Sequence, residues 1–162
     1  MLVLLVEDDE NKIVQLTQFL SESFRGVQIV TSRSLRNGVY QLRNACPQLI
    51  ILDMTLPNYD IGPDEPGGQM HPLGGREFLR QMDRFDLKVP VIVVTQFERF
   101  GKGPEAMDLR DLDRVLQRDH PSVYRGLVYY HAAIHGWKEE LKSLIIKVDP
   151  NVSRGHSEDT CS

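Results

Sequence analysis

The chain has 162 residues, the length of a single domain with a buried hydrophobic core. Hydrophobic residues make up 41% of it and charged residues 26%, which is typical of a globular protein rather than a disordered one. With 19 basic and 23 acidic side chains the net charge is −4, so we expect no binding to nucleic acid or to a membrane. The start of the chain lacks the pattern of a signal peptide, and two cysteines are too few for a disulfide framework. We therefore expect a cytoplasmic protein.

Apolar residues in the first third of the chain alternate between two periods. Short continuous apolar runs predict strands buried on both faces, at residues 2–6, 27–30 and 49–52. Between these runs, apolar residues spaced three or four apart predict helices that bury one face, with Ser34 as the N-cap of the second helix. The apolar helical positions are Ile13, Leu16, Leu20 and Phe24 in the first helix and Leu35, Val39 and Leu42 in the second.

The rest of the chain repeats this alternation. The expected strands are residues 89–94 and 127–130, and the expected helices lie near residues 78–82, 109–116 and 137–148. Five strands alternating with five helices predict an α/β fold, a single five-stranded parallel sheet with helices on both faces. We expect residues 1–148 to form this domain and the polar residues 149–162 to be a disordered C-terminal tail.

Glycine and proline are concentrated in the connection after the third strand. They make up nine of the nineteen residues from Pro57 to Gly75. Connections in α/β units usually run to about 2–6 residues, and longer ones tend to be functional or disordered. Because Gly and Pro disfavour regular structure, we expect an irregular loop beside the end of the third strand.

Acidic residues follow two of the predicted strands. Glu7, Asp8 and Asp9 end the first strand, and Asp53 ends the third. The carboxyl ends of parallel strands share one edge of the sheet, where ligands bind in open α/β folds. Carboxylates crowded together repel one another unless a cation lies between them, and oxygen ligands suit Mg²⁺. The sequence therefore predicts a magnesium site in which a carboxylate can accept a phosphoryl group.

Three segments resemble the receiver domain of bacterial response regulators in two-component signalling. They read LLVEDDE at residues 4–10, LIILDMTLP at 49–57 and VPVIVVT at 89–95. The resemblance is strong over residues 1–57, returns at 76–97 and is loose afterwards. It implies the flavodoxin-like (βα)5 fold.

The resemblance also implies roles for individual residues. Asp53 matches the phosphoryl acceptor, and Thr95 matches the switch hydroxyl that moves toward an arriving phosphoryl group. The metal ligands that the family pattern implies are Glu7, Asp8, Asp53 and the backbone carbonyl of Thr55, with Asp9 as a substitute.

One residue of the family pattern is missing. Receivers carry a lysine at the end of the fifth strand, whose ammonium pairs with the acceptor aspartate and the phosphoryl oxygens. That position falls at Tyr130 here, with His131 next to it, and no lysine lies between Lys102 and Lys138. Tyr130 can donate one hydrogen bond, and His131 is charged only when protonated. Lys102 is a further candidate that could approach the site from another direction.

The leading hypothesis is a stand-alone receiver domain that is not an enzyme. A histidine kinase or phosphotransfer protein would phosphorylate Asp53 with Mg²⁺ as cofactor, and output would pass to a downstream protein, with a homodimer as one arrangement. The missing lysine motivates an alternative, a pseudo-receiver that binds partners without phosphorylation. A remote alternative is an aspartate-nucleophile phosphohydrolase, which needs an acid two residues after Asp53, where Thr55 stands.

Overall fold

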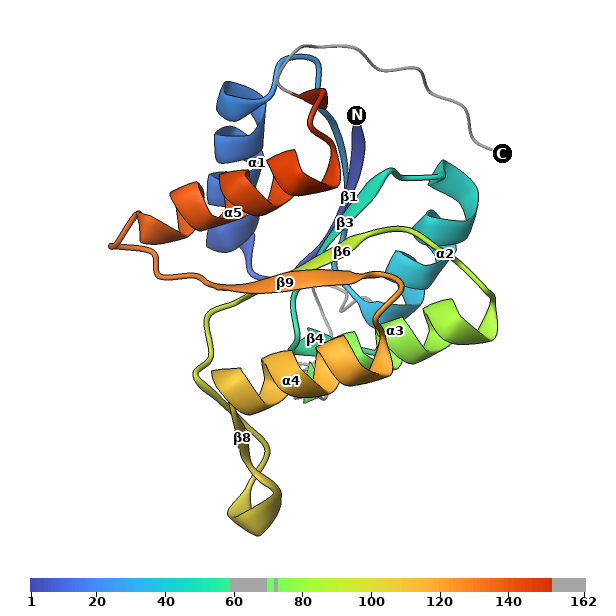
Figure 1. Cartoon of the computed structure of the whole chain (residues 1–162), viewed down its shortest axis with the longest axis vertical. Coiled ribbons are helices and arrows are strands. Elements are labelled where there is room, and N and C mark those ends of the chain that lie inside the picture. The colour runs from blue at the N-terminus through green and yellow to red at the C-terminus, as the bar shows by residue number, and fades with distance from the viewer. Residues whose placement is uncertain (59–69, 72, 153–162) are drawn as a thin grey trace, which may run out of the picture.

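The computed structural model describes residues 1–58, 70–71 and 73–152. Its main feature is a five-stranded parallel sheet in the order β2-β1-β3-β6-β9 (Figure 1). The strands are β1 (Leu2–Val6), β2 (Gln28–Ser32), β3 (Leu49–Leu52), β6 (Val91–Thr95) and β9 (Tyr124–Tyr129). The predicted parallel sheet is confirmed, with β9 beginning three residues earlier than expected.

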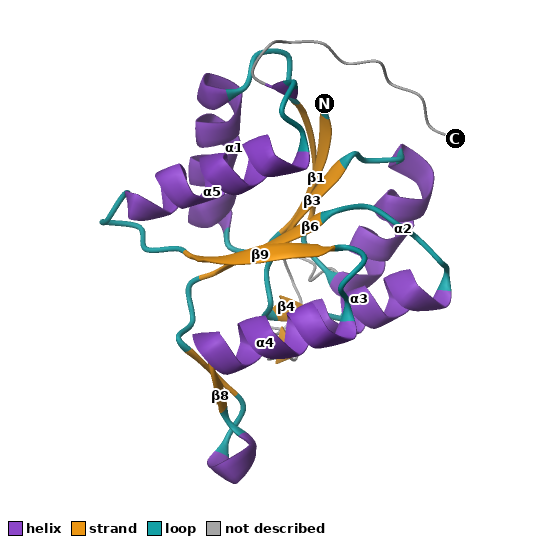
Figure 2. Ribbon diagram, in the orientation of Figure 1, coloured by secondary structure: helices purple, strands orange, loops and turns teal. Residues whose placement is uncertain are grey.

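Helices cover both faces of the sheet, which confirms the predicted fold class (Figures 1 and 2). One face carries α1 (Glu10–Ser23) and α5 (Gly136–Val148). The opposite face carries α2 (Leu35–Ala45), α3 (Gly74–Arg84) and α4 (Leu109–Asp119).

The sheet separates two hydrophobic clusters. On the face of α1 and α5, apolar side chains of both helices pack on alternate residues of the central strands, and Trp137 is among them. On the other face, Phe78 and Leu112 belong to the cluster that packs against β1, β3 and β6. β1 and β3 are apolar throughout, and β6 is apolar up to its last residue, Thr95, because both faces of these strands are covered.

The predicted irregular loop is closed at its base. Strand β4 (Leu56–Pro57) pairs antiparallel with β5 (Met70–His71), so the two ends of the segment lie side by side. Residues 59–69 and 72 lie outside the described residues. Gly74 and Gly75 were expected to belong to the irregular loop, but they form the first turn of α3. Their missing side chains serve close packing, since a Cβ on Gly75 would lie 2.8 Å from the carbonyl oxygen of Asp53.

A hairpin projects from the molecule between β6 and α4 (Figure 2). Its strands are β7 (Arg99–Phe100) and β8 (Met107–Asp108), joined by the short 3-10 helix η1 (Gly103–Glu105). Asp108 also begins α4, because its carboxylate accepts a hydrogen bond from the backbone N–H of Asp111 and the Asp111 carboxylate accepts one from Asp108.

The chain after α5 continues along the core. Val152 is buried against the cluster of α1 and α5, and its backbone N–H bonds the carbonyl of Asp149. The remainder of the segment predicted to be a tail, residues 153–162, lies outside the described residues. None of the helices in the described part of the chain combines the length and apolar character that crossing a bilayer requires.

Candidate functional site

The acidic residues predicted from the sequence meet at the carboxyl ends of β1 and β3. These strands are neighbours at the point where the strand order reverses, which is where open parallel sheets bind ligands. Glu7 and Asp53 are buried, and Asp8 is half-buried. One carboxylate oxygen from each of Glu7, Asp8 and Asp53 lies within 4.8 Å of the others.

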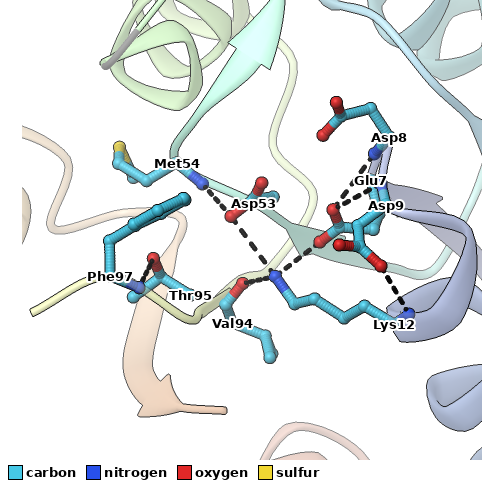
Figure 3. Close-up of polar contacts among 9 residues, drawn as sticks. All are labelled: Glu7, Asp8, Asp9, Lys12, Asp53, Met54, Val94, Thr95 and Phe97. Atoms are coloured by element: carbon cyan, nitrogen blue, oxygen red, sulfur yellow. Dashed lines mark hydrogen bonds and ion pairs between the residues drawn. The ribbon is translucent and has the colours of Figure 1, made fainter. Parts of the chain in front are cut away.

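A lysine outside all of the sequence motifs lies within this cluster (Figure 3). Lys12 is in the first turn of α1, and its side chain is only 1% exposed. Its Nζ lies 2.5 Å from Oε2 of Glu7 and 3.3 Å from Oδ1 of Asp53, and it donates to the carbonyl oxygen of Val94 at 2.7 Å. An ammonium group has three N–H donors, so there is one partner for each of them.

Backbone groups hold the two buried carboxylates in place. Oε1 of Glu7 accepts hydrogen bonds from the backbone N–H groups of Asp8 at 3.1 Å and Asp9 at 3.0 Å. Oδ1 of Asp53 accepts one from the N–H of Met54 at 2.9 Å. The turns after β1 and β3 therefore orient the acids with main-chain donors, which cost no side-chain entropy.

Burial and the ammonium act on the carboxylates in opposite directions. Burial raises the pKa of Glu7 and of Asp53, and the Lys12 ammonium opposes that rise at both groups. Burial also raises the pKa of Asp8. For Lys12 itself, burial lowers the pKa, but the carboxylates of Asp53 and Glu7 outweigh burial and raise it above its ordinary value. The two carboxylates therefore favour the charged form of the Lys12 amine inside the cluster.

Thr95 occupies the end of β6, the strand beside β3. It is fully buried, and its Oγ1 accepts a hydrogen bond from the backbone N–H of Phe97 at 3.2 Å. The hydroxyl is thus held by the chain that leads into the hairpin of β7 and β8. Its role as a switch remains a prediction.

The other candidates lie in different surroundings. Tyr130 follows β9 and is buried, with its ring centroid 5.7 Å from Nζ of Lys12. His131 is exposed and accepts a hydrogen bond from the N–H of Ala133. Lys102 is exposed in the projecting hairpin. Asp9 caps α1, since its Oδ1 accepts from the N–H of Lys12 at 3.0 Å.

The donor set fits a hard divalent cation. Mg²⁺ takes carboxylate and carbonyl oxygens and usually keeps several waters, so one or two carboxylates are sufficient. Asp8 and Asp53 provide them, and in Figure 3 the Asp8 carboxylate points away from Lys12. Glu7 is the carboxylate nearest to the ammonium, so it balances Lys12 at the same time. The carbonyl of Thr55 remains the predicted backbone ligand.

Helical periodicity was the signal that could have revealed Lys12. It lies four residues before Leu16 and eight before Leu20, so it continues the apolar stripe of α1 to its first turn. A lysine on a buried stripe, one helical turn after a cluster of acids, predicts an internal ion pair.

Comparison with known proteins agrees with the fold. No family model matches the chain. The uncharacterized protein y4jR of Sinorhizobium fredii is 36% identical over 152 residues, which cover 92% of this chain and 99% of that protein. The Detocs response regulatory protein DtcB of Enterobacter cloacae is 29% identical over 143 residues, 87% of this chain and 95% of that one.

Solved structures show the same fold. The Mn²⁺-bound form of response regulator Rcp1 superposes with a TM-score of 0.63 at 18% identity, covering 98% of this chain and 99% of that one. Further neighbours with this fold are receiver domains as well.

Proposed function

We propose that this chain is a response-regulator receiver in which Asp53 accepts a phosphoryl group in the presence of Mg²⁺, and that the phosphorylated form signals through contact with another protein. The receiver fold of its structural neighbours and its similarity to the response regulatory protein DtcB support this proposal. The observation that supports this most directly is the placement of Asp53. It is buried at the end of a central strand, with Glu7 and Asp8 close enough to share a cation with it.

The proposed reaction is transfer from a phosphohistidine of a histidine kinase or phosphotransfer protein in the cytoplasm. A carboxylate oxygen of Asp53 attacks phosphorus, a P–O bond forms, and the P–N bond of the donor breaks. The histidine nitrogen keeps the electron pair of that bond and takes up a proton. Because Lys12 opposes the effect of burial on the pKa of Asp53, it favours the ionised, nucleophilic carboxylate.

Mg²⁺, held by Asp8, Asp53 and the Thr55 carbonyl, would neutralise negative charge on the transferring group. The chain supplies the remaining parts of the site. Main-chain N–H groups fix Glu7 and Asp53, and the hydroxyl of Thr95 stands at the end of the neighbouring strand. If Thr95 turns toward the phosphoryl group, it gives up the N–H of Phe97, and the change reaches the hairpin and α4.

One observation favours the alternative of a phosphorylation-independent module. Lys12 already pairs with two of the three carboxylates, so the cluster is partly neutralised without a metal or phosphate. In that case the site would serve folding alone. Partner binding would then be indifferent to a phosphodonor.

Intact-mass measurement distinguishes the two functions. Incubation with acetyl phosphate and Mg²⁺ should add one phosphoryl group to the wild-type chain and none to Asp53→Asn. Asp86→Asn is the matched control, because Asp86 is an exposed aspartate of the same chain, and this variant should be labelled like the wild type. A wild-type chain that stays unlabelled contradicts the proposed function, and so does equal labelling of Asp53→Asn.

A further inference from the structure

The structure assigns a role to Lys12: its ammonium pairs with the phosphoryl group on Asp53. This lysine is on α1, whereas receivers carry the corresponding lysine at the end of the fifth strand. Tyr130 fills the space at that strand end. This inference rests on the proposed function, and it names the residue that provides the cation for that same site.

The position of Lys12 follows from the turn between β1 and α1. Asp9 caps the helix by accepting the N–H of Lys12, so α1 starts directly beside the carboxyl edge of the sheet. The Cβ of a helical residue points toward the N-terminus of the helix, which directs the Lys12 side chain back to that edge. It reaches past Glu7 to Asp53 on β3 and to the carbonyl of Val94 on β6 (Figure 3).

Among the described residues, Lys12 provides the cation that pairs with the acceptor. Among the ion pairs of residues 1–58, 70–71 and 73–152, both that involve the acidic cluster are made by Lys12. The candidates expected from sequence, Lys102 and His131, are exposed elsewhere. A phosphoryl group on Asp53 adds negative charge in a buried place, and a buried charge requires a partner of opposite sign. Lys12 can provide it by turning from Glu7 toward the new oxygens.

Tyr130 occupies the position that a lysine on the fifth strand would need. Its N–H donates to the carbonyl of Thr95 at 2.8 Å, which fixes it next to β6. Trp137 packs against it with ring centroids 5.1 Å apart, and Nζ of Lys12 lies 5.7 Å from its centroid. The aromatic ring thus provides a negative face beside the relocated ammonium. Lys12 on α1 and Tyr130 after β9 therefore lie in contact, with the amine facing the aromatic ring.

The test compares phosphorylation rates by intact mass with acetyl phosphate and Mg²⁺. Lys12→Gln should be labelled roughly 100-fold more slowly than the wild type, the effect of removing one donor to a developing anion. Lys138→Gln is the control, because Lys138 also lies 5.7 Å from an aromatic ring, that of Trp137, but makes no ion pair with the acidic cluster. It should be labelled at the wild-type rate. The double variant Lys12→Met with Tyr130→Lys returns the amine to the fifth strand and should regain part of the rate.

A second measurement needs no variant at the site. The ¹⁵N signal of the buried Lys12 ammonium in the wild-type chain should shift when beryllofluoride and Mg²⁺ are added, while that of Lys138 should not. Labelling of Lys12→Gln at the wild-type rate, or an unchanged Lys12 signal in a chain that is labelled on Asp53, overturns this inference and leaves the proposed function standing. A wild-type chain that is neither labelled nor responsive to beryllofluoride overturns both.

Discussion

The two halves of the sheet differ in what they contribute at the carboxyl edge. In the described part of the chain, the charged groups of the site come from the ends of β1 and β3 and from the first turn of α1. Glu7, Lys12 and Asp53 are buried, and Asp8 is half-buried. β6 and β9 supply a hydroxyl, a main-chain carbonyl and an aromatic ring. The charge of the site therefore depends on contacts within the first 53 residues, whereas the second half determines what the site is connected to.

Breaking the buried ion pair tests the first half most strongly. In Glu7→Gln, Lys12 loses its nearest partner while it stays buried, and Asp53 at 3.3 Å compensates in part. We expect the free energy of unfolding to fall by about 3 kcal/mol, measured by urea denaturation. Arg33→Ala is the control, because it removes an ion pair with Glu10 in which both side chains are at least half exposed, and it should change stability by at most about 1 kcal/mol. Equal losses in the two variants would contradict the assignment of a buried pair.

The contact between α3 and the acceptor strand gives a smaller effect. In Gly75→Ala the new Cβ would lie 2.8 Å from the carbonyl oxygen of Asp53 and 3.0 Å from Cα of Met54, so backbone must move. We expect a loss of about 1–3 kcal/mol in the same denaturation experiment. Gly136→Ala at the start of α5 meets no atom within 4 Å and should be neutral or stabilise by up to about 1 kcal/mol. The reverse order of these two glycine variants would show that α3 does not rest on the acceptor strand.

The smallest effect belongs to the second half. Asp108→Ala removes the side-chain cap of α4 and one bond of its capping box, and it should lower stability by about 1 kcal/mol. Glu105→Ala, which changes an exposed acid in the same hairpin, should stay within about 0.5 kcal/mol. Thermal unfolding followed by circular dichroism measures both. A larger loss in Asp108→Ala than in Glu7→Gln would invert the contrast between the two halves.

The sequence predicted the sheet and its acids because those signals are local. Apolar runs determine which strands are buried, and Asp53 follows one of them directly. The role of Lys12 in the acidic cluster depends on how α1 packs against three strands, and no short motif encodes that packing. Gly75 shows the same limit, since glycine before a helix is typical of a loop, while here the close approach of Asp53 requires it. Burial of Tyr130 against Trp137 likewise depends on the packing of α5.

The ladder between β4 and β5 makes the segment it closes a natural place for insertions. Leu56 and Pro57 pair with His71 and Met70, so the two ends of this segment are held next to each other by backbone pairing. The entropic cost of closing a loop grows slowly, by about 0.6 kcal/mol for each doubling of its length. Residues can therefore be inserted between β4 and β5, in evolution or as a grafted reporter peptide, while the contacts of Asp53 are kept.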